Sequence, residues 1–575
     1  ATTQQWRRAE RNAQHAEAAR RLLVGVFENA SPDENHGKAI TAHQLLEKGE
    51  KLIAAQSGKS PATQADLTGL IGGLYWDIGD YPRAENLLKE AVASNASTDV
   101  PPEVKARNLV RMAKVKIEKN QYDEGIAFAR EALTWARQAG EPAAAEGSQA
   151  RREIADGLIG GGHATEAEPL LREAMAVDQA RSDDGGEAVA DNLMLLGYAL
   201  LELSRLDEAI ATDRLAIEAQ IRIHGRTNSN VTYSMGTLAT ALRNQGKFVE
   251  AENVLREAVA IMETMYAPDH REMMTVRSNL LLTLENQGRY AEALDGRRAM
   301  LETQKKLSVE RPDVMAYAYK NMAGDLLGLG RFVDAEATAR DALAAWNGIQ
   351  GSENEWHSVA ARDALALALQ FQGKYAEAES AMRKTIDIQQ THEAPRSIWL
   401  AGSRTNLGNL LRLSHRLPEA AALLRDALAA LPETASPTRA SLLAAMAETA
   451  TDQSEFEMAQ RFATDALTLA RAVLPAHNVR LGTPLFALAR VKAAQASPAE
   501  AEALLSEALA VRHPPYPDDD PRVLELQVDR VRALEELGKT DEARILRARI
   551  GALLQASSSP YTIDLRARLA PRSAR

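Results

Sequence analysis

The sequence predicts an all-α protein built as a solenoid of about twelve helical hairpins. One short phrase recurs at a nearly fixed interval along the 575 residues, and apolar residues within each interval recur at helical spacing. No segment alternates apolar and polar residues over a length that would favour a strand. Together these observations indicate stacked helical repeats, each too small to bury a core alone.

The recurring phrase is exemplified by "QGKYAEAE", which begins at Gln372 and contains an alanine that we take as the anchor of its repeat. Successive anchors are 39 to 43 residues apart, most often 42. The twelve anchors are Ala84, Gly125, Ala167, Ala209, Ala251, Ala293, Ala335, Ala378, Ala420, Ala459, Ala501 and Ala543. A fixed period of this size is typical of a solenoid.

Each repeat is predicted to contain two helices. The first carries apolar residues at helical spacing, as at Leu193, Leu196 and Leu200. It ends at a turn that is often Gly-Lys or Gly-Arg, where glycine adopts the left-handed conformation without strain. The second helix follows the anchor, with an apolar stripe such as Leu88 and Ala91.

Small residues at fixed positions predict close packing of the two helices. The residue 12 positions before the anchor is Gly or Ala in ten of the twelve repeats, and a large apolar residue usually precedes it. A leucine at the small position would overpack the pair by roughly 1–3 kcal/mol. The repeat anchored at Ala293 departs from this pattern, with Leu281, Arg297 and Met300 at positions that are elsewhere small or apolar. The last repeat also departs, with Arg530 and Val531.

These features resemble the tetratricopeptide repeat, in its 42-residue variety found in kinesin light chains. The phrases "PDH" at 268–270, "RPDV" at 311–314 and "DPRV" at 520–523 are similar to the loop phrase of that variety. The resemblance covers about residues 61–550, and we assign the array to residues 58–550. It implies a right-handed superhelix with a concave wall that holds a peptide or protein partner.

The N-terminal residues 1–57 are predicted to hold one helix over residues 3–29 and then a half repeat, "TAHQLLEKGEKLIAAQ". Residues 7–53 resemble the segment after the membrane helix in a group of bacterial transmembrane Ser/Thr protein kinases. The resemblance implies a periplasmic sensor region, the outer part of an inner-membrane protein. Since the sequence starts without Met, we expect a piece of a longer protein or a processed one. The alternative is a soluble, cytoplasmic repeat protein with the same phrase.

The C-terminal residues 551–575 leave the period. The segment contains three consecutive serines and two prolines, and we expect it to be frayed. Its four arginines are most simply a solvated tail: Arg566, Arg568, Arg572 and Arg575.

The composition excludes several classes of protein. The net charge is −11, so the chain lacks the excess of basic residues that is typical of a nucleic-acid binder. No run of 18 apolar residues is present, so this chain is not expected to span a membrane. It has no cysteine, which excludes disulfides and thiolate zinc sites.

The sequence offers no catalytic constellation. The eleven histidines have no metal-ligand spacing, and His270, His357, His415 and His477 fall in predicted turns, where capping is the simplest role. The Gly-rich "GLIGGGHA" at 157–164 lacks the Lys-Ser/Thr of a phosphate loop, and "PDDDP" at 517–521 is typical of a surface loop. No kinase motif is present. We therefore expect no enzyme activity, no cofactor and no metal in this chain.

The resemblance places the groove-lining residues about 18, 15, 14, 11 and 7 positions before each anchor. In the central repeats these positions are polar and rich in Asn, whose amide can pair with any peptide backbone, and Tyr adds rigid apolar surface. The candidate partner-binding residues are Tyr233, Thr240, Asn244, Ser278, Asn279, Asn286, Tyr317, Lys320, Asn321, Thr405, Asn406 and Asn409. Equally, these side chains can serve only to solvate an exposed helix face.

The flanking repeats are expected to present a more acidic wall, through Asp156, Asp191 and Glu202 early and Glu448, Asp452 and Glu536 late.

Two functions remain open from the sequence. The first is a partner-sensing solenoid in which groove binding changes the curvature or the pairing of two chains in a homodimer. The second is a soluble scaffold that assembles a protein complex. Neither involves nucleic acid.

Overall fold

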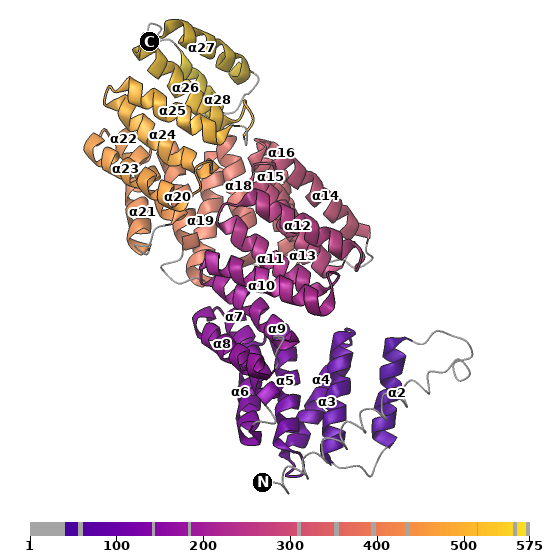
Figure 1. Ribbon diagram of the computed structural model, residues 1–575. Coiled ribbons are helices and arrows are strands. Elements are labelled where there is room, and N and C mark those ends of the chain that lie inside the picture. The colour runs from indigo at the N-terminus through magenta and orange to yellow at the C-terminus, as the bar shows by residue number, and fades with distance from the viewer. Residues whose placement is uncertain are drawn as a thin grey trace. The chain divides into compact units, whose positions relative to one another are not determined.

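The computed structural model describes residues 41–55, 61–140, 144–181, 186–268, 270–306, 312–349, 356–392, 398–431, 436–513, 516–555 and 560–570. Their contacts divide the chain into unit 1, which ends at Ala241, and unit 2, which begins at Leu242. These residues form 26 α-helices and no strand (Figure 1), which confirms the all-α prediction. The helix expected over residues 3–29 lies outside the described residues.

Unit 1 contains a single helix followed by four antiparallel pairs. The single helix is α2 (Ala42–Ala55). The pairs are α3 (Pro61–Asp77) with α4 (Tyr81–Ala93), α5 (Pro102–Glu118) with α6 (Tyr122–Ala139), α7 (Ala144–Gly160) with α8 (Ala164–Arg181), and α9 (Glu187–Glu202) with α10 (Leu206–His224). A short 3-10 helix, η1, follows α4 at Ser94–Ala96. The division between the units falls inside α11 (Ser229–Asn244).

Unit 2 continues with α12 (Phe248–Glu263) and seven further pairs. They are α13 (Arg271–Asn286) with α14 (Tyr290–Lys306), α15 (Pro312–Gly328) with α16 (Phe332–Asn347), α18 (Val359–Phe371) with α19 (Tyr375–His392), α20 (Ile398–Leu413) with α21 (Leu417–Ala430), α22 (Pro437–Asp452) with α23 (Phe456–Val473), α24 (Gly482–Ala494) with α25 (Pro498–Arg512), and α26 (Pro521–Glu536) with α27 (Thr540–Gln555). The short η3 (Val479–Leu481) precedes α24, and α28 (Pro560–Leu569) ends the described chain.

Every repeat turns at one residue with positive φ, placed five positions before its anchor. Seven of these residues are glycines, which confirms the predicted left-handed turn: Gly79, Gly162, Gly246, Gly288, Gly330, Gly373 and Gly538. The other five are Asn120, Ser204, His415, Ser454 and Ala496. The geometry is the same in both sets, because the backbone N–H groups of the turn residue and of its successor donate to carbonyls of the preceding helix. In the turn at Ala496, the N–H of Ala496 donates to Ala493 O at 3.1 Å and that of Ser497 to Lys492 O at 2.9 Å. The repeat therefore fixes the turn even where glycine is missing.

The predicted small positions are sites of close helix packing. A Cβ added at Gly72 would meet Leu88 at 3.0 Å, and one added at Gly408 would collide with Leu424. Leu88 and Leu424 each lie four positions after their anchors and are fully buried. The anchor alanines are buried as well, at 0–1 % exposure. These two hairpins are thus joined by one small residue facing one large residue.

The irregular repeat of Ala293 is accommodated by two compensating changes. Leu281 occupies the small position, and Gly296 on the facing helix provides the space, because a Cβ there would collide with the Leu281 side chain. Arg297 is 5 % exposed and forms ion pairs with Glu285, at 2.9 Å, and with Asp325 of the next repeat. The sequence pattern identified the departures, and the structure shows the partners that allow them.

The C-terminal end differs from the predicted solvated tail. Residues 560–569 form α28, which packs on α26 and α27 and buries Tyr561 and Leu565. Arg568, expected in solvent, pairs with Glu525 at 3.1 Å and with Asp529 at 2.6 Å. The apolar face of α28 covers the end of the array, so this segment is ordered by burial. Residues 556–559 and 571–575 lie outside the described residues.

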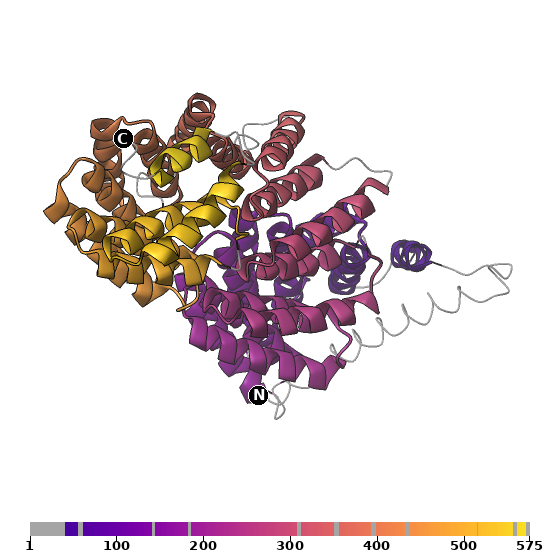
Figure 2. The same ribbon diagram turned by 90° about the horizontal axis from the view of Figure 1, so that it is seen from above.

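Unit 2 also contacts itself across a long stretch of sequence. Arg522, at the start of α26, donates to the backbone oxygen of Leu327 at the end of α15, at 2.8 Å. Its guanidinium lies 3.7 Å from the centroid of Tyr516 and 5.5 Å from that of Phe371. Figure 2 shows the yellow helices of the C-terminal end beside the pink and brown helices of the middle of this unit.

Among the described residues, no helix is both long enough and apolar enough to cross a bilayer.

Candidate functional site

Unit 2 contains a pocket of about 690 Å³ formed by the first helices of four consecutive repeats, α15, α18, α20 and α22. It is lined mainly by apolar surface, with polar groups at its edges. Its lining residues include Tyr317, Ala360, Gly402 and Ser441, each 18 positions before an anchor, and Asp363 and Thr405, each 15 positions before one. The expected groove positions therefore face a shared concavity in these repeats.

Two aromatic side chains dominate the exposed surface of this pocket. Trp399 is 74 % exposed and Tyr317 is 43 % exposed. The Tyr317 hydroxyl is hydrogen bonded to His357 Nδ1 at 3.0 Å, and the Tyr317 ring packs edge-on against Trp346 at 4.9 Å. Because its neighbours fix Tyr317, the ring offers apolar surface with little entropy left to lose on binding.

The polar groups of the pocket include an amide, a carboxyl and a guanidinium, from Asn406, Asp363 and Arg480. Burial raises the pKa of Asp363 to about 7, against the opposing effects of Thr385 and Arg362. Gln389 is 2 % exposed, and its Oε1 accepts no hydrogen bond from any described residue. An apolar pocket with a few convergent polar groups is the usual form of a recognition site.

Three of the residues predicted from sequence meet in this pocket: Tyr317, Thr405 and Asn406. The hydroxyl of Thr405 donates to the Ala401 carbonyl at 2.8 Å, so this side chain can offer a ligand its methyl group and an acceptor oxygen but no hydrogen-bond donor. Lys320 lies nearby, with Nζ 6.0 Å from the Tyr317 ring, and burial and Arg297 lower its pKa.

The other predicted residues lie outside this pocket. Asn321 and Asn409 are half-buried on α15 and α20, and Ser278, Asn279 and Asn286 lie on α13. Tyr233, Thr240 and Asn244 belong to α11, where Tyr233 is 47 % exposed. Two of these side chains bond within their own helix: Thr240 to Gly236 O at 2.9 Å and Asn286 to Leu282 O at 2.7 Å.

The sequence reasoning missed several residues of the pocket, among them Trp356, His357, Trp399 and Arg480. These residues lie at or before the starts of the first helices, outside the positions counted back from the anchors. A signal was present, since Trp356 and Trp399 are two of only six tryptophans in a chain that is 5 % aromatic.

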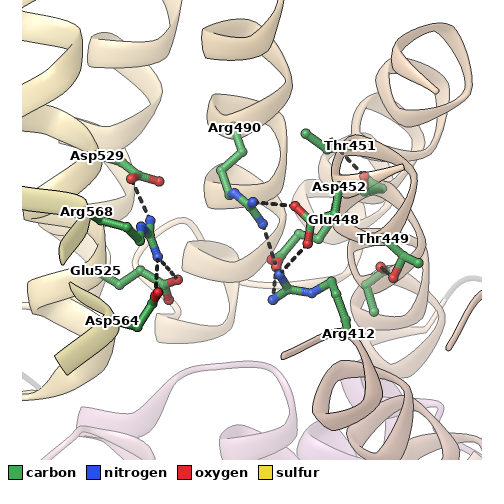
Figure 3. Close-up of polar contacts among 12 residues, drawn as sticks. Arg412, Glu448, Thr449, Thr451, Asp452, Arg490, Glu525, Asp529, Asp564 and Arg568 are labelled. Carbon is green, nitrogen blue, oxygen red and sulfur yellow. Dashed lines mark hydrogen bonds and ion pairs between the residues drawn. The ribbon is translucent and has the colours of Figure 1, made fainter. Parts of the chain in front are cut away.

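A second pocket of unit 2, about 920 Å³, lies against α20, α22, α24, α26 and α28 and is charged (Figure 3). Arg412 pairs with Glu448 at 2.5 Å and with Asp452 at 3.0 Å, and Arg490 pairs with Asp452 at 2.7 Å. Against the effect of burial, Arg490 and Arg412 hold the pKa of Asp452 below its usual value. The expectation of an acidic late wall is thus wrong for Glu448 and Asp452, whose charges are matched within the wall.

No group of three or more His, Asp or Glu side chains in the described part of the chain is placed to hold a metal ion.

Comparisons with known proteins identify the repeat. One family model described as "Tetratricopeptide repeat" matches residues 188–264, 314–391 and 358–433, and a second with the same description matches residues 106–138. A kinesin light chain-related protein of Arabidopsis thaliana is 25 % identical over 280 residues, which are 47 % of this chain and 44 % of that protein. The chain therefore spans less than half the length of this curated relative.

Several solved structures are also similar. BtubC (BKLC) from P. vanneervenii is 18 % identical and covers 39 % of this chain and 91 % of its own, with a TM-score of 0.32. A chain of the Cut9-Hcn1 hetero-tetramer of the APC/C is 12 % identical, and the match covers 90 % of this chain and 98 % of that one, with a TM-score of 0.40. The apo form of RapI is 10 % identical, and the match covers 66 % of this chain and 98 % of that one, with a TM-score of 0.44.

Proposed function

Because this chain is a tetratricopeptide-repeat protein with repeats of the kinesin-light-chain type, we propose that it binds a segment of a partner protein in the aromatic pocket of unit 2. The observation that carries this proposal is the convergence of Tyr317 from α15 with Trp399 and Asn406 from α20, two different repeats, on one apolar concavity. Residues of four consecutive repeats line this concavity, so the site exists only in the stacked array.

The chemistry of the pocket suits a peptide with an apolar side chain. Trp399 and Tyr317 supply area that loses water on contact, at roughly 25 cal/mol per Å² of apolar surface. The Asn406 amide has both a donor and an acceptor, so it can pair with a peptide backbone of any sequence. The apolar surface thus supplies most of the affinity, and the amide fixes the direction of the bound chain.

A random-peptide selection against the full chain tests this proposal. Peptides that bind should bind at least about tenfold more weakly to Trp399→Ala and to Asn406→Ala, as hot-spot truncations do. The matched control is Ile545→Ala, which removes an apolar side chain of α27 that is 65 % exposed. The proposal would be wrong if the selected peptides still bound to Trp399→Ala and to Asn406→Ala. Loss of binding in the double variant Asn279→Ala with Asn321→Ala would then indicate a site on α13 and α15.

For the whole protein, we further propose that this chain is the sensor region of a bacterial receptor Ser/Thr kinase, located in the periplasm. Support comes from the phrase over residues 7–53 and from α2, which lies one period before α4 and packs on α3 as a half repeat. Partner binding would then be transmitted toward the membrane through the N-terminal residues. The alternative function is a soluble scaffold that assembles several proteins.

The coding sequence that precedes the codon of Ala1 separates these two functions. A kinase domain followed by one apolar helix is expected for the receptor. Another repeat protein, or a start codon directly upstream, would leave the scaffold as the function.

A further inference from the structure

Unit 2 contacts itself along a seam, where the hairpin turns of its early repeats meet the loops between its late repeats. A Cβ added at Gly246, in the turn before α12, would collide with the Pro475 ring, in the loop after α23. The ring of Tyr290, at the start of α14, stacks on that of Tyr516, before α26, at a centroid distance of 6.3 Å. Stacked repeats usually contact only their neighbours, so these contacts are additional to the stacking of the array. The residues of the seam are Gly246, Tyr290, Leu327, Gly330 and Phe371 on the early side and Pro475, Tyr516, Asp520, Arg522 and Tyr561 on the late side.

Arg522 lies in the middle of the seam. Its guanidinium donates to the carbonyl oxygen of Leu327 and to the carboxylate of Asp520, both at 2.8 Å, and lies 3.7 Å from the centroid of the Tyr516 ring. The side chain of Arg522 is 19 % exposed, and that of Asp520 is fully buried. Charge-assisted hydrogen bonds are stronger where water is largely excluded, so Arg522 is the residue on which the seam depends most.

Two helices held at the seam form the aromatic pocket at their opposite ends. In α15, Tyr317 lines the pocket and Leu327 reaches the seam ten residues later, about 15 Å along the helix. In α18, Asp363 lines the pocket and Phe371, the last residue, lies at the seam, where its ring packs edge-on against Tyr561 of α28 at 5.8 Å. Each helix therefore connects the pocket to the C-terminal end of the array.

The helix α20 repeats this arrangement with an apolar contact. Trp399 and Asn406 line the pocket, and Leu413, the last residue of α20, packs on the apolar cluster that joins α26, α27 and α28. A helix moves as a rigid element, so fixing its far end limits the tilt of the end that lines the pocket. Three of the four pocket helices are thus held from their far ends by the C-terminal helices.

We propose that the seam positions the aromatic pocket: a closed seam holds Tyr317 and Trp399 in the arrangement that a partner segment fits, and a bound segment tightens the seam in return. This inference rests on the proposed partner-binding function and adds its regulation. An open seam lowers the fraction of the protein that is competent to bind, and the apparent affinity falls by that fraction. The coupling is reciprocal by thermodynamic necessity. Arg522 is accordingly a positioning residue, since it touches the pocket helices at their far ends and does not line the pocket.

The first test measures the affinity of peptides that are selected from a random library on the full chain and depend on Trp399. These peptides should bind about tenfold more weakly to Arg522→Ala, within the 5- to 150-fold range of typical couplings. Arg522→Lys, which keeps the charge but lacks the planar donor fork, should give an intermediate loss. Tyr516→Leu, which removes the ring beside the guanidinium, should weaken the same peptides. The matched control is Arg544→Ala on α27, whose side chain is 75 % exposed.

Hydrogen exchange supplies a readout that a loss of stability alone would not move. Adding a selected peptide to the wild-type chain should slow exchange in α26 and α28, although none of their described residues lines the pocket. In Arg522→Ala the same peptide, at a concentration that saturates the variant, should leave exchange in α26 and α28 unchanged. Circular dichroism shows which variants are folded, and Arg522→Lys and Tyr516→Leu carry the test if Arg522→Ala is not.

The outcomes separate this inference from the proposed function. Equal affinity of the Trp399-dependent peptides for the wild type and the seam variants would overturn the inference and leave the proposed function standing. Weaker binding to the variants, without slower exchange in α26 and α28 when the wild type is saturated, would also overturn it, because the seam would then affect stability alone. A selection without any binder would refute the proposed function and the inference with it.

Discussion

Replacing Asp213 by leucine should stabilise unit 1, and by an amount that grows with pH. Asp213 lies on α10, is 0 % exposed, and neither of its carboxylate oxygens has a hydrogen-bond partner among the described residues. It sits against Gly197, where a Cβ would collide with it. The equivalent pairs elsewhere are Gly72 with Leu88 and Gly408 with Leu424, so the same hairpin geometry already accepts a leucine.

The magnitude follows from the pKa of this carboxyl. Burial raises the pKa of Asp213 from 3.8 to about 8. The folded state therefore holds a proton that the unfolded state has released, and stability falls as pH rises from about 4 to about 8. The slope is about 1.4 kcal/mol per pH unit, so between pH 5 and pH 7 the wild-type chain should lose about 3 kcal/mol that Asp213→Leu retains.

Hydrogen exchange measured by mass spectrometry across α9 and α10 is the appropriate assay, because repeat arrays open locally. After correction for intrinsic exchange, the free energy of opening should depend on pH in the wild type and be flat over this range in Asp213→Leu. Asp213→Asn should remove the pH slope but keep the cost of a buried polar group, about 1–3 kcal/mol. Glu218→Gln, on the exposed side of α10, is the control. Equal pH slopes in the wild type and Asp213→Leu would refute the reasoning.

Three further substitutions follow from the fold. Ala496→Gly should raise the melting temperature, by relieving about 1 kcal/mol of strain at a φ of 55°; a lower melting temperature would contradict the strain. Arg297→Met should destabilise unit 2 by about 3–5 kcal/mol in urea unfolding, because it leaves Asp325 buried and unpaired, and adding Asp325→Leu should recover most of that loss. Arg522→Ala should speed hydrogen exchange in α26 through loss of a charge-assisted bond of about 1.5–3 kcal/mol, whereas unchanged exchange there would show that the contact with Leu327 contributes nothing.

The repeat itself could be predicted because its physical causes are local. The interval between anchors, the small residue facing a large one and the left-handed turn all follow from residues within one repeat. The groove positions came instead from the resemblance to the family, and three of the residues at these positions, Thr405, Asn406 and Tyr317, meet in one pocket.

Features that depend on residues far apart in sequence could not be predicted. Arg412, from the preceding repeat, pairs with Glu448, so a count of acidic residues alone overstates the negative charge of that part of the wall. The sequence predicts a solvated Arg568, because nothing near this residue in the sequence indicates its ion pair with Glu525. Trp399 could not be predicted as a site residue, because it lies outside the groove positions counted back from the anchors.

The contact of Arg522 with the end of α15 has a consequence for how this protein can evolve. Tandem arrays usually gain or lose whole modules by unequal recombination, since each module touches only its neighbours. Between Leu327 and Arg522, however, a duplicated or deleted module would shift one side of the contact along the array and separate the guanidinium from its carbonyl and aromatic rings. Changes in module number should therefore be confined to the chain outside the stretch from α15 to α26, while the modules within it diverge only by point substitution.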